Sequence, residues 1–286
     1  MVSGMELIPD RREILRYLGY KGAAPDEEIL REIDVCVDDR NKAVTPRFVY
    51  EKFALSREPA QPPENKTSED GTAGMGTSGE DAAEEQLCFA GIRVCSRALS
   101  INLRECCGVY LMAVTLGPWP DMLVRRASVN RMSRAVIYQA AAAAMTEVWC
   151  DQINERIRRE AEREGLYTRP RFSPGYGDLP LSLQKDISRI LNMPKEIGVS
   201  LTDTMLMTPS KSVTALIGVS RVPAGHRNGF LKTGCADCPA SAECAYAMPD
   251  PERLSYPEAM PDPERMPDSK GIPDSESVNK SEKSLR

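Results

Sequence analysis

The sequence predicts an α+β fold, and two kinds of segment carry that prediction. Residues 108–116 form a continuous apolar run, which is typical of a strand covered on both faces. Helical patterns follow at about 121–128 and 130–164, and the second of them is rich in alanine. The order of elements therefore favours helices packed on one largely antiparallel sheet.

Shorter segments complete this pattern on both sides of the apolar run. Glu13 begins a predicted short helix, and Pro25 opens a second one. A predicted strand, an amphipathic helix and the two strands of a predicted hairpin follow at residues 47–55, 183–191, 204–207 and 213–219. We expect these elements to build one main domain.

Two low-complexity tracts divide the chain. One is rich in Pro, Gly, Ser, Thr, Asp and Glu, and the other repeats Met-Pro-Asp, so neither is able to bury a core. The predicted parts are an N-terminal α+β part (1–56), a disordered insertion (57–87), the main core (88–230), a Cys-rich segment (231–247) and a disordered Pro-rich tail (248–286).

Composition excludes several classes of protein. A net charge of -5 over 286 residues argues against a nucleic-acid binder, which carries a basic surface. There is no apolar run of about eighteen residues, so no membrane span is expected. Nine cysteines, an odd count, fit a reducing cytoplasm better than a disulfide scaffold. The single His226 argues against a Ser-His or Cys-His nucleophile, so a cofactor is expected to supply any reactive atom.

The segment Arg171-Phe-Ser173-Pro-Gly175-Tyr176 places a cation, a Pro-Gly turn and an aromatic ring within six residues. Glycine permits a backbone conformation or a close approach that a Cβ forbids. Such a turn is able to bring backbone amides, a guanidinium and a ring face against one small charged ligand.

A carboxylate interrupts an apolar stripe in the long predicted helix. Met132, Val136, Ala140 and Ala143 follow helical spacing, and Glu147 is next on the same stripe. We therefore expect Glu147 against the core or a cleft, where a carboxylate needs a positive partner. That partner is either a nearby Arg side chain or the ammonium or sulfonium group of a ligand, and spacing alone leaves both open.

Three segments resemble the activation domain of cobalamin-dependent methionine synthase, and they occur in the same order. Residues 145–158 resemble that family's long helix, with its internal Glu and later Glu-Arg-x-Arg. Residues 171–176 resemble its Arg-x-Ala-Pro-Gly-Tyr loop, and residues 201–213 its Leu-Thr-Glu to Pro-x-x-Ser-Val stretch. The resemblance covers roughly residues 108–220.

This resemblance implies a C-shaped α+β domain that binds S-adenosylmethionine (SAM). In the family, the domain docks over a cobalamin that has been oxidised to Co(II), and one electron and one methyl group restore methylcobalamin. The chain is thus expected to be a stand-alone reactivation subunit of a methyltransferase system. Its partners are expected to be a cobalamin-binding methionine synthase or another corrinoid protein, and a reductase such as flavodoxin or ferredoxin.

The family's site residues carry over by motif. Arg171, Ser173, Gly175 and Tyr176 would form the SAM loop, and Glu147 matches the acidic residue of the adjacent helix. Arg171 suits the SAM carboxylate through a bidentate contact. Because a sulfonium methyl group is already activated, no catalytic side chain is assigned.

Two departures from the family pattern stand out. Residues 177–180 read Gly-Asp-Leu-Pro, where the family enzyme carries Pro-Ala-Cys-Pro. Around His226, the cobalamin motif Asp-x-His-x-x-Gly lacks its Asp, because Ala224 stands there. The cobalamin is therefore expected to arrive on the partner protein.

Cys235-x-x-Cys238-x5-Cys244 is a second candidate site. This spacing suits zinc or an iron–sulfur cluster, but a fourth ligand is not evident, and free thiols are the alternative. Two other functions remain open at this point. One is a non-catalytic module that docks on a corrinoid protein, and the other is a redox activator that uses these cysteines.

Overall fold

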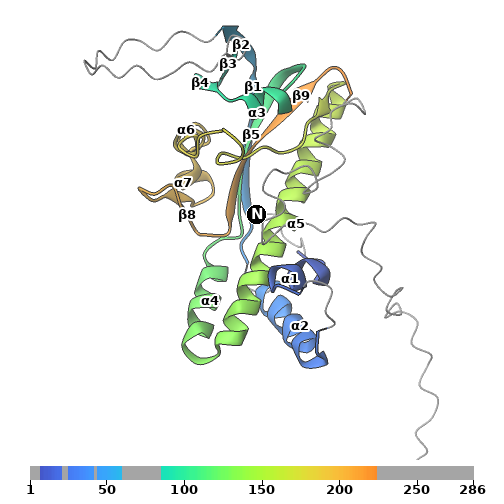
Figure 1. Cartoon of the computed structure of the whole chain (residues 1–286), viewed down its shortest axis with the longest axis vertical. Coiled ribbons are helices and arrows are strands. Elements are labelled where there is room, and N and C mark those ends of the chain that lie inside the picture. Colours follow the sequence, from blue (N-terminus) through green and yellow to red (C-terminus); the bar gives the residue numbers. More distant parts are fainter. Residues whose placement is uncertain (1–6, 21–24, 42–43, 60–84, 224–286) are drawn as a thin grey trace, which may run out of the picture. The chain divides into compact units, whose positions relative to one another are not determined.

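The computed structural model describes residues 7–20, 25–41, 44–59 and 85–223 (Figure 1). The Cys-rich segment, the Pro-rich tail and most of the predicted insertion lie outside the described residues. Within the described part of the chain, no helix is long and apolar enough to span a membrane.

The main sheet is antiparallel, with strands in the order β1-β5-β9-β6. The bounds are Arg47–Ala54 for β1, Cys106–Thr115 for β5, Ser212–Ser220 for β9 and Tyr167–Thr168 for β6. The β5 run is buried on both faces because β5 is a central strand, as its continuous apolar pattern predicts. The α+β prediction is confirmed.

Helix α5 (Met132–Arg163) covers one face of this sheet. Its Trp149 and Ile153 pack with Tyr110 and Met112 of β5 and with Ile217 of β9. The indole N–H of Trp149 also donates a hydrogen bond of 3.1 Å to the Arg47 carbonyl. These contacts fix the middle of α5 against the sheet.

Smaller elements cover the opposite face. Val109 and Leu111 of β5 alternate with the residues that face α5. They pack with Leu216 of β9 and with Leu183 and Ile187 of helix α6 (Leu183–Ile190). The elements on this side are β2 (Ser56–Pro59), β3 (Glu85–Phe89), β4 (Ile92–Cys95), α3 (Arg97–Asn102), α6 and α7 (Met193–Glu196). Strands β2, β3 and β4 form their own antiparallel sheet.

The N-terminal half of α5 packs against helices instead of the sheet. These helices are α1 (Arg11–Tyr17), α2 (Glu27–Asn41) and α4 (Trp119–Asn130). Ile14 of α1 and Ile33 of α2 share a buried cluster with Ala140, Ala141 and Ala144 of α5. The small alanine side chains allow this close packing of helices.

Two details of the sequence prediction are wrong. Met132 and Val136 are exposed, so the buried face of α5 is rotated away from the predicted stripe and includes Met145 and Trp149. The predicted hairpin also fails, because β8 (Met207–Thr208) pairs with β7 (Ser200–Leu201), whereas β9 pairs with β5 and β6. Long-range pairing thus takes the place of the expected local partner.

Candidate ligand-binding site

The Arg171 loop is attached to the edge of β9. The Phe172 N–H donates to the Leu216 carbonyl at 2.9 Å, and the Leu216 N–H donates back at 2.8 Å. Phe172 packs against the core on the side of α6, together with Leu216. Because successive residues of an extended segment point to opposite faces, Arg171 is directed towards α5.

Arg171 forms ion pairs with two carboxylates of α5. Its Nη1 lies 2.7 Å from Asp151 Oδ1, and its Nη2 lies 3.3 Å from Glu147 Oε2. The two acids are one helical turn apart, which places them on the same side of α5. The side chain of Arg171 is 24% exposed, against 52% for Glu147 and 72% for Asp151. We call these three residues the Arg171 cluster.

The structure corrects the expected burial of Glu147. Its side chain is half exposed, beside the buried face of α5 that carries Met145 and Trp149. The first of the two expected partners, a protein cation, is present as Arg171. The remaining exposure of the carboxylate leaves room for a second, bound partner.

Asp151 is the residue that sequence reasoning missed. The only signal for it is its position four residues after Glu147, one turn along the helix. Near neutral pH, two carboxylates and one guanidinium give the Arg171 cluster one surplus negative charge. Beneath them, burial raises the pKa of the Cys150 thiol to about 12, so this thiol stays protonated and is not a nucleophile.

The turn after Arg171 is closed by backbone hydrogen bonds. The Gly175 N–H donates to the Leu179 carbonyl at 2.9 Å, and the Tyr176 N–H donates to the Ser173 carbonyl at 3.2 Å. Gly175 has a φ of 91°, a left-handed conformation that glycine adopts without strain. The Tyr176 side chain is exposed and its ring lies 6.5 Å from that of Phe172. The loop therefore presents an aromatic ring to solvent.

The departure at residues 177–180 has a structural role in this chain. The Asp178 carboxylate accepts hydrogen bonds from the Ser96 hydroxyl and from the N–H groups of Arg97 and Ala98. These hydrogen bonds, that of Ser96 first, lower the pKa of Asp178. A Cβ on Gly177 would lie only 2.8 Å from the Ala98 Cβ, so glycine allows this contact. The turn that follows Arg171 is thereby tied to the start of α3.

Helix α1 flanks the Arg171 cluster through Tyr17. Burial raises the pKa of Tyr17, and the negative charge of Glu147 raises it further. The Arg16 guanidinium lies over the Tyr17 ring, 4.4 Å from its centroid, and is paired with Glu13 at 2.8 Å. Together Arg16 and Glu13 add no net charge beside the cluster. Sequence reasoning gave α1 no place at the site.

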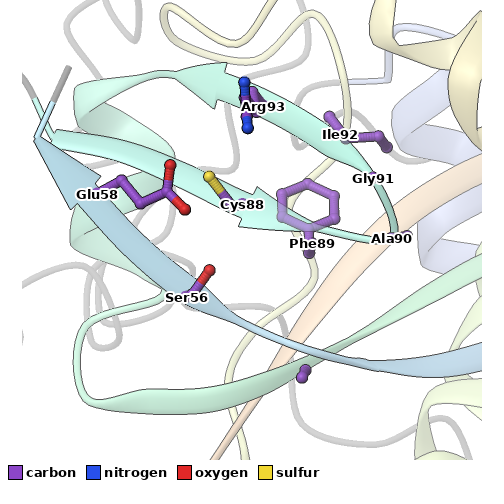
Figure 2. Close-up of a pocket in the computed structure, with 9 residues that line it drawn as sticks. Ser56, Glu58, Cys88, Phe89, Ala90, Gly91, Ile92 and Arg93 are labelled. Atoms are coloured by element: carbon purple, nitrogen blue, oxygen red, sulfur yellow. The ribbon is translucent and has the colours of Figure 1, made fainter. Parts of the chain in front are cut away.

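A pocket lies elsewhere, on the β2–β3–β4 sheet, and none of the predicted site residues lines it. Its volume is about 540 Å³, and its lining includes Ser56, Glu58, Cys88 and Arg93 (Figure 2). Burial and the neighbouring Glu58 raise the pKa of Cys88, which disfavours the thiolate. We call this place the β2–β4 pocket.

The predicted metal site lies outside the described residues, because Cys235, Cys238 and Cys244 all fall after residue 223. Among the residues that the structure describes, no group of three or more His, Cys, Asp or Glu side chains is placed to hold a metal ion. The zinc or iron–sulfur prediction gains no support from the described part of the chain.

A comparison with protein families agrees with the resemblance. Residues 121–223 match the family described as "Vitamin B12 dependent methionine synthase, activation domain". One similar solved structure is the MetH reactivation domain bound to AdoHcy, with 18% sequence identity and a TM-score of 0.48, over 76% of this chain and 77% of that one. No curated protein sequence matches the chain.

The matched segment runs from α4 to the end of β9 and contains the motifs at 145–158, 171–176 and 201–213. It therefore includes the whole Arg171 cluster. Over residues 121–223, the chain is similar to the activation domain of vitamin B12-dependent methionine synthases.

Proposed function

We propose that this protein is a SAM-binding reactivation subunit that supports reductive methylation of Co(II)-cobalamin on a partner methionine synthase. The observation that carries the proposal is the Arg171 cluster, which joins the loop at residues 171–176 to Glu147 and Asp151 of α5. This cluster lies inside the segment that matches the activation-domain family.

The charges of the Arg171 cluster are complementary to those of SAM. SAM has a carboxylate, an ammonium and a sulfonium, so its net charge near neutral pH is one positive. The cluster offers a guanidinium to the carboxylate and two carboxylates to the positive groups, with one surplus negative charge. Charge-assisted hydrogen bonds of this kind are stronger than neutral ones and fix orientation.

Each predicted site residue has a role that its geometry allows. Arg171 would exchange a helix carboxylate for the SAM carboxylate, and Glu147, half exposed, would face the ammonium or the sulfonium. Gly175 leaves the turn without a Cβ, and Ser173 lies inside it. The exposed ring of Tyr176 offers a π face to the positive end of the ligand.

SAM supplies an activated methyl group when it is bound, so the protein needs to orient it and to exclude water. This division of labour explains why no catalytic base is assigned. The cobalamin would come from the partner methionine synthase or another corrinoid protein. The electron would come from a reductase such as a flavodoxin or a ferredoxin.

Calorimetric titration with SAM tests the proposal. The wild-type protein is expected to bind SAM, and Arg171→Ala is expected to weaken binding by about 100-fold, because a charge-assisted bidentate contact is lost. Arg93→Ala, which removes an exposed arginine from the β2–β4 pocket, is the matched control and should bind like wild type.

Equal SAM affinity in wild type and Arg171→Ala would overturn the assignment of the loop. If the wild type alone binds no SAM but does so with a Co(II)-cobalamin protein present, the site is completed by the partner. Binding in neither case would favour the non-catalytic docking module.

A further inference from the structure

Asp151 has no role in the family resemblance, yet it makes the shorter of the two ion pairs of Arg171. The pair with Asp151 measures 2.7 Å, against 3.3 Å for the pair with Glu147. One guanidinium balances one carboxylate, so the second acid is in excess. We infer that Asp151 is a specificity-determining residue that makes the site prefer SAM over its demethylated product, S-adenosylhomocysteine. This inference rests on the proposed function.

SAM and S-adenosylhomocysteine differ in the charge of one atom, the sulfur. When SAM loses its methyl group, the S–C bond breaks and the bonding electron pair stays on sulfur. The positive sulfonium thereby becomes an uncharged thioether, while the carboxylate and the ammonium are unchanged. A negative charge close to the sulfur therefore stabilises bound SAM and leaves bound S-adenosylhomocysteine almost unaffected.

The described neighbours considered next do not cancel the surplus charge on α5. Glu13 and Arg16 on the adjacent helix are paired with each other, and the Cys150 thiol stays protonated because burial raises its pKa. Farther along α5, Glu155 is neutralised by ion pairs with Arg158 and Arg159. Asp151 and Glu147 thus share one negative charge that Arg171 does not balance, and replacing Asp151 by Asn removes it.

The location of Asp151 also fits a role in selectivity. Its side chain is 72% exposed, so a ligand is able to approach it, and its removal leaves no buried group without a partner. Glu147 alone still pairs with Arg171, so the guanidinium stays in place when Asp151 is changed. Release of S-adenosylhomocysteine, whose sulfur carries no charge, would be faster than release of SAM.

The experiment compares affinities for two ligands in three proteins. SAM and S-adenosylhomocysteine are titrated into wild type, Asp151→Asn and Glu155→Gln at low ionic strength. Asp151→Asn is expected to lower the ratio of SAM affinity to S-adenosylhomocysteine affinity by about three- to tenfold, the range for a solvent-exposed charge. Glu155→Gln removes the same charge from the same helix and is expected to leave the ratio unchanged.

Two further measurements sharpen the result. Sinefungin carries an amine in place of the sulfonium. Its affinity is expected to depend on Asp151 as that of SAM does, because the site would recognise the positive charge and not the methyl group. Added salt is expected to shrink the wild-type ratio towards that of Asp151→Asn, since screening weakens exposed charges.

An affinity ratio that is the same in wild type and Asp151→Asn, with both ligands bound, overturns the role of Asp151 and leaves the proposed function intact. A wild-type protein that binds neither ligand, alone or with its partner, overturns the proposed function and this inference together. A ratio that falls equally in Glu155→Gln assigns the effect to total charge instead of to Asp151.

Discussion

The Arg171 cluster and the β2–β4 pocket both combine acidic and basic side chains at the surface, but they are built differently. The cluster joins residues 20 and 24 positions apart, from a helix and a loop on the edge of the main sheet. The pocket takes Glu58, Cys88 and Arg93 from neighbouring strands of one small sheet. The pocket has a volume of about 540 Å³, whereas the cluster has defined ion pairs.

This difference shows that a pocket with a large volume need not be the place where charged groups suited to a ligand are gathered. The pocket offers space, but its thiol has a raised pKa and its lining contains none of the residues of the family motifs. The cluster offers charges of both signs at fixed distances, inside the segment that matches the activation-domain family. We therefore propose that the ligand binds at the cluster and not at the pocket.

Replacing one phenylalanine in each region gives the largest expected effects. Phe89→Ala, at the pocket, removes a buried ring and should lower the free energy of unfolding by about 3–5 kcal/mol. Phe172→Ala, under the loop, should cost about 1–2 kcal/mol because that ring is only partly buried. Urea denaturation with SAM titration checks both, since only Phe172→Ala should also weaken SAM binding. A weakened affinity in folded Phe89→Ala alone would reverse the comparison.

Two glycines with positive φ form a matched pair. Gly175 of the loop has a φ of 91°, and Gly91 of the pocket turn has a φ of 75°. Alanine at either position adopts a strained left-handed conformation and should lower stability by about 1–2 kcal/mol. Thermal denaturation should show similar losses in both variants, whereas calorimetry should show weaker SAM binding in Gly175→Ala only. Equal affinities in the two variants would contradict a role for the loop backbone.

Asp178 links the loop to α3, and its contribution to stability depends on pH. The pKa of Asp178 is lowered in the folded protein, so its stabilising effect is present above the unfolded pKa of about 3.9 and is lost as pH falls through the folded value. Asp178→Asn should cost about 1 kcal/mol at pH 7, as for the loss of a helix cap. Denaturation series at pH 7 and below pH 4 should show the difference from wild type shrinking. A difference that persists at low pH would exclude the carboxylate as its cause.

Thiol reactivity gives the smallest expected effect. Burial and Glu58 raise the pKa of Cys88, so Glu58→Gln should speed its alkylation by iodoacetamide at pH 8 by about two- to threefold. Peptide mass spectrometry separates Cys88 from the chain's other cysteines. Saturating SAM should leave the Cys88 rate unchanged, and protection by SAM would place the ligand in the β2–β4 pocket.

Much of the fold follows from local sequence patterns. The central strand β5, the pair α4 and α5, and β1 are confirmed, because each is long enough for its periodicity to identify it. The β8 pairing was predicted wrongly, since a strand's partner depends on distant residues. The rotation of α5 was also missed, because alanine fits either face of a helix and gives little directional signal.

The site was predicted in part, for a similar reason. The motif at residues 171–176 marks the loop, and helical spacing singled out Glu147 as a carboxylate in need of a positive partner. Asp151 could be identified only from the structure, in which Arg171 lies against α5. The role of Asp178 likewise depends on α3, some eighty residues earlier in the chain.

A crystal structure of the protein with SAM bound tests the central claim most directly. We expect the ligand carboxylate within hydrogen-bonding distance of the Arg171 guanidinium, with a positive group of the ligand beside Glu147. SAM bound instead among Glu58, Cys88 and Arg93, with Arg171 still paired to both helix carboxylates, would contradict it.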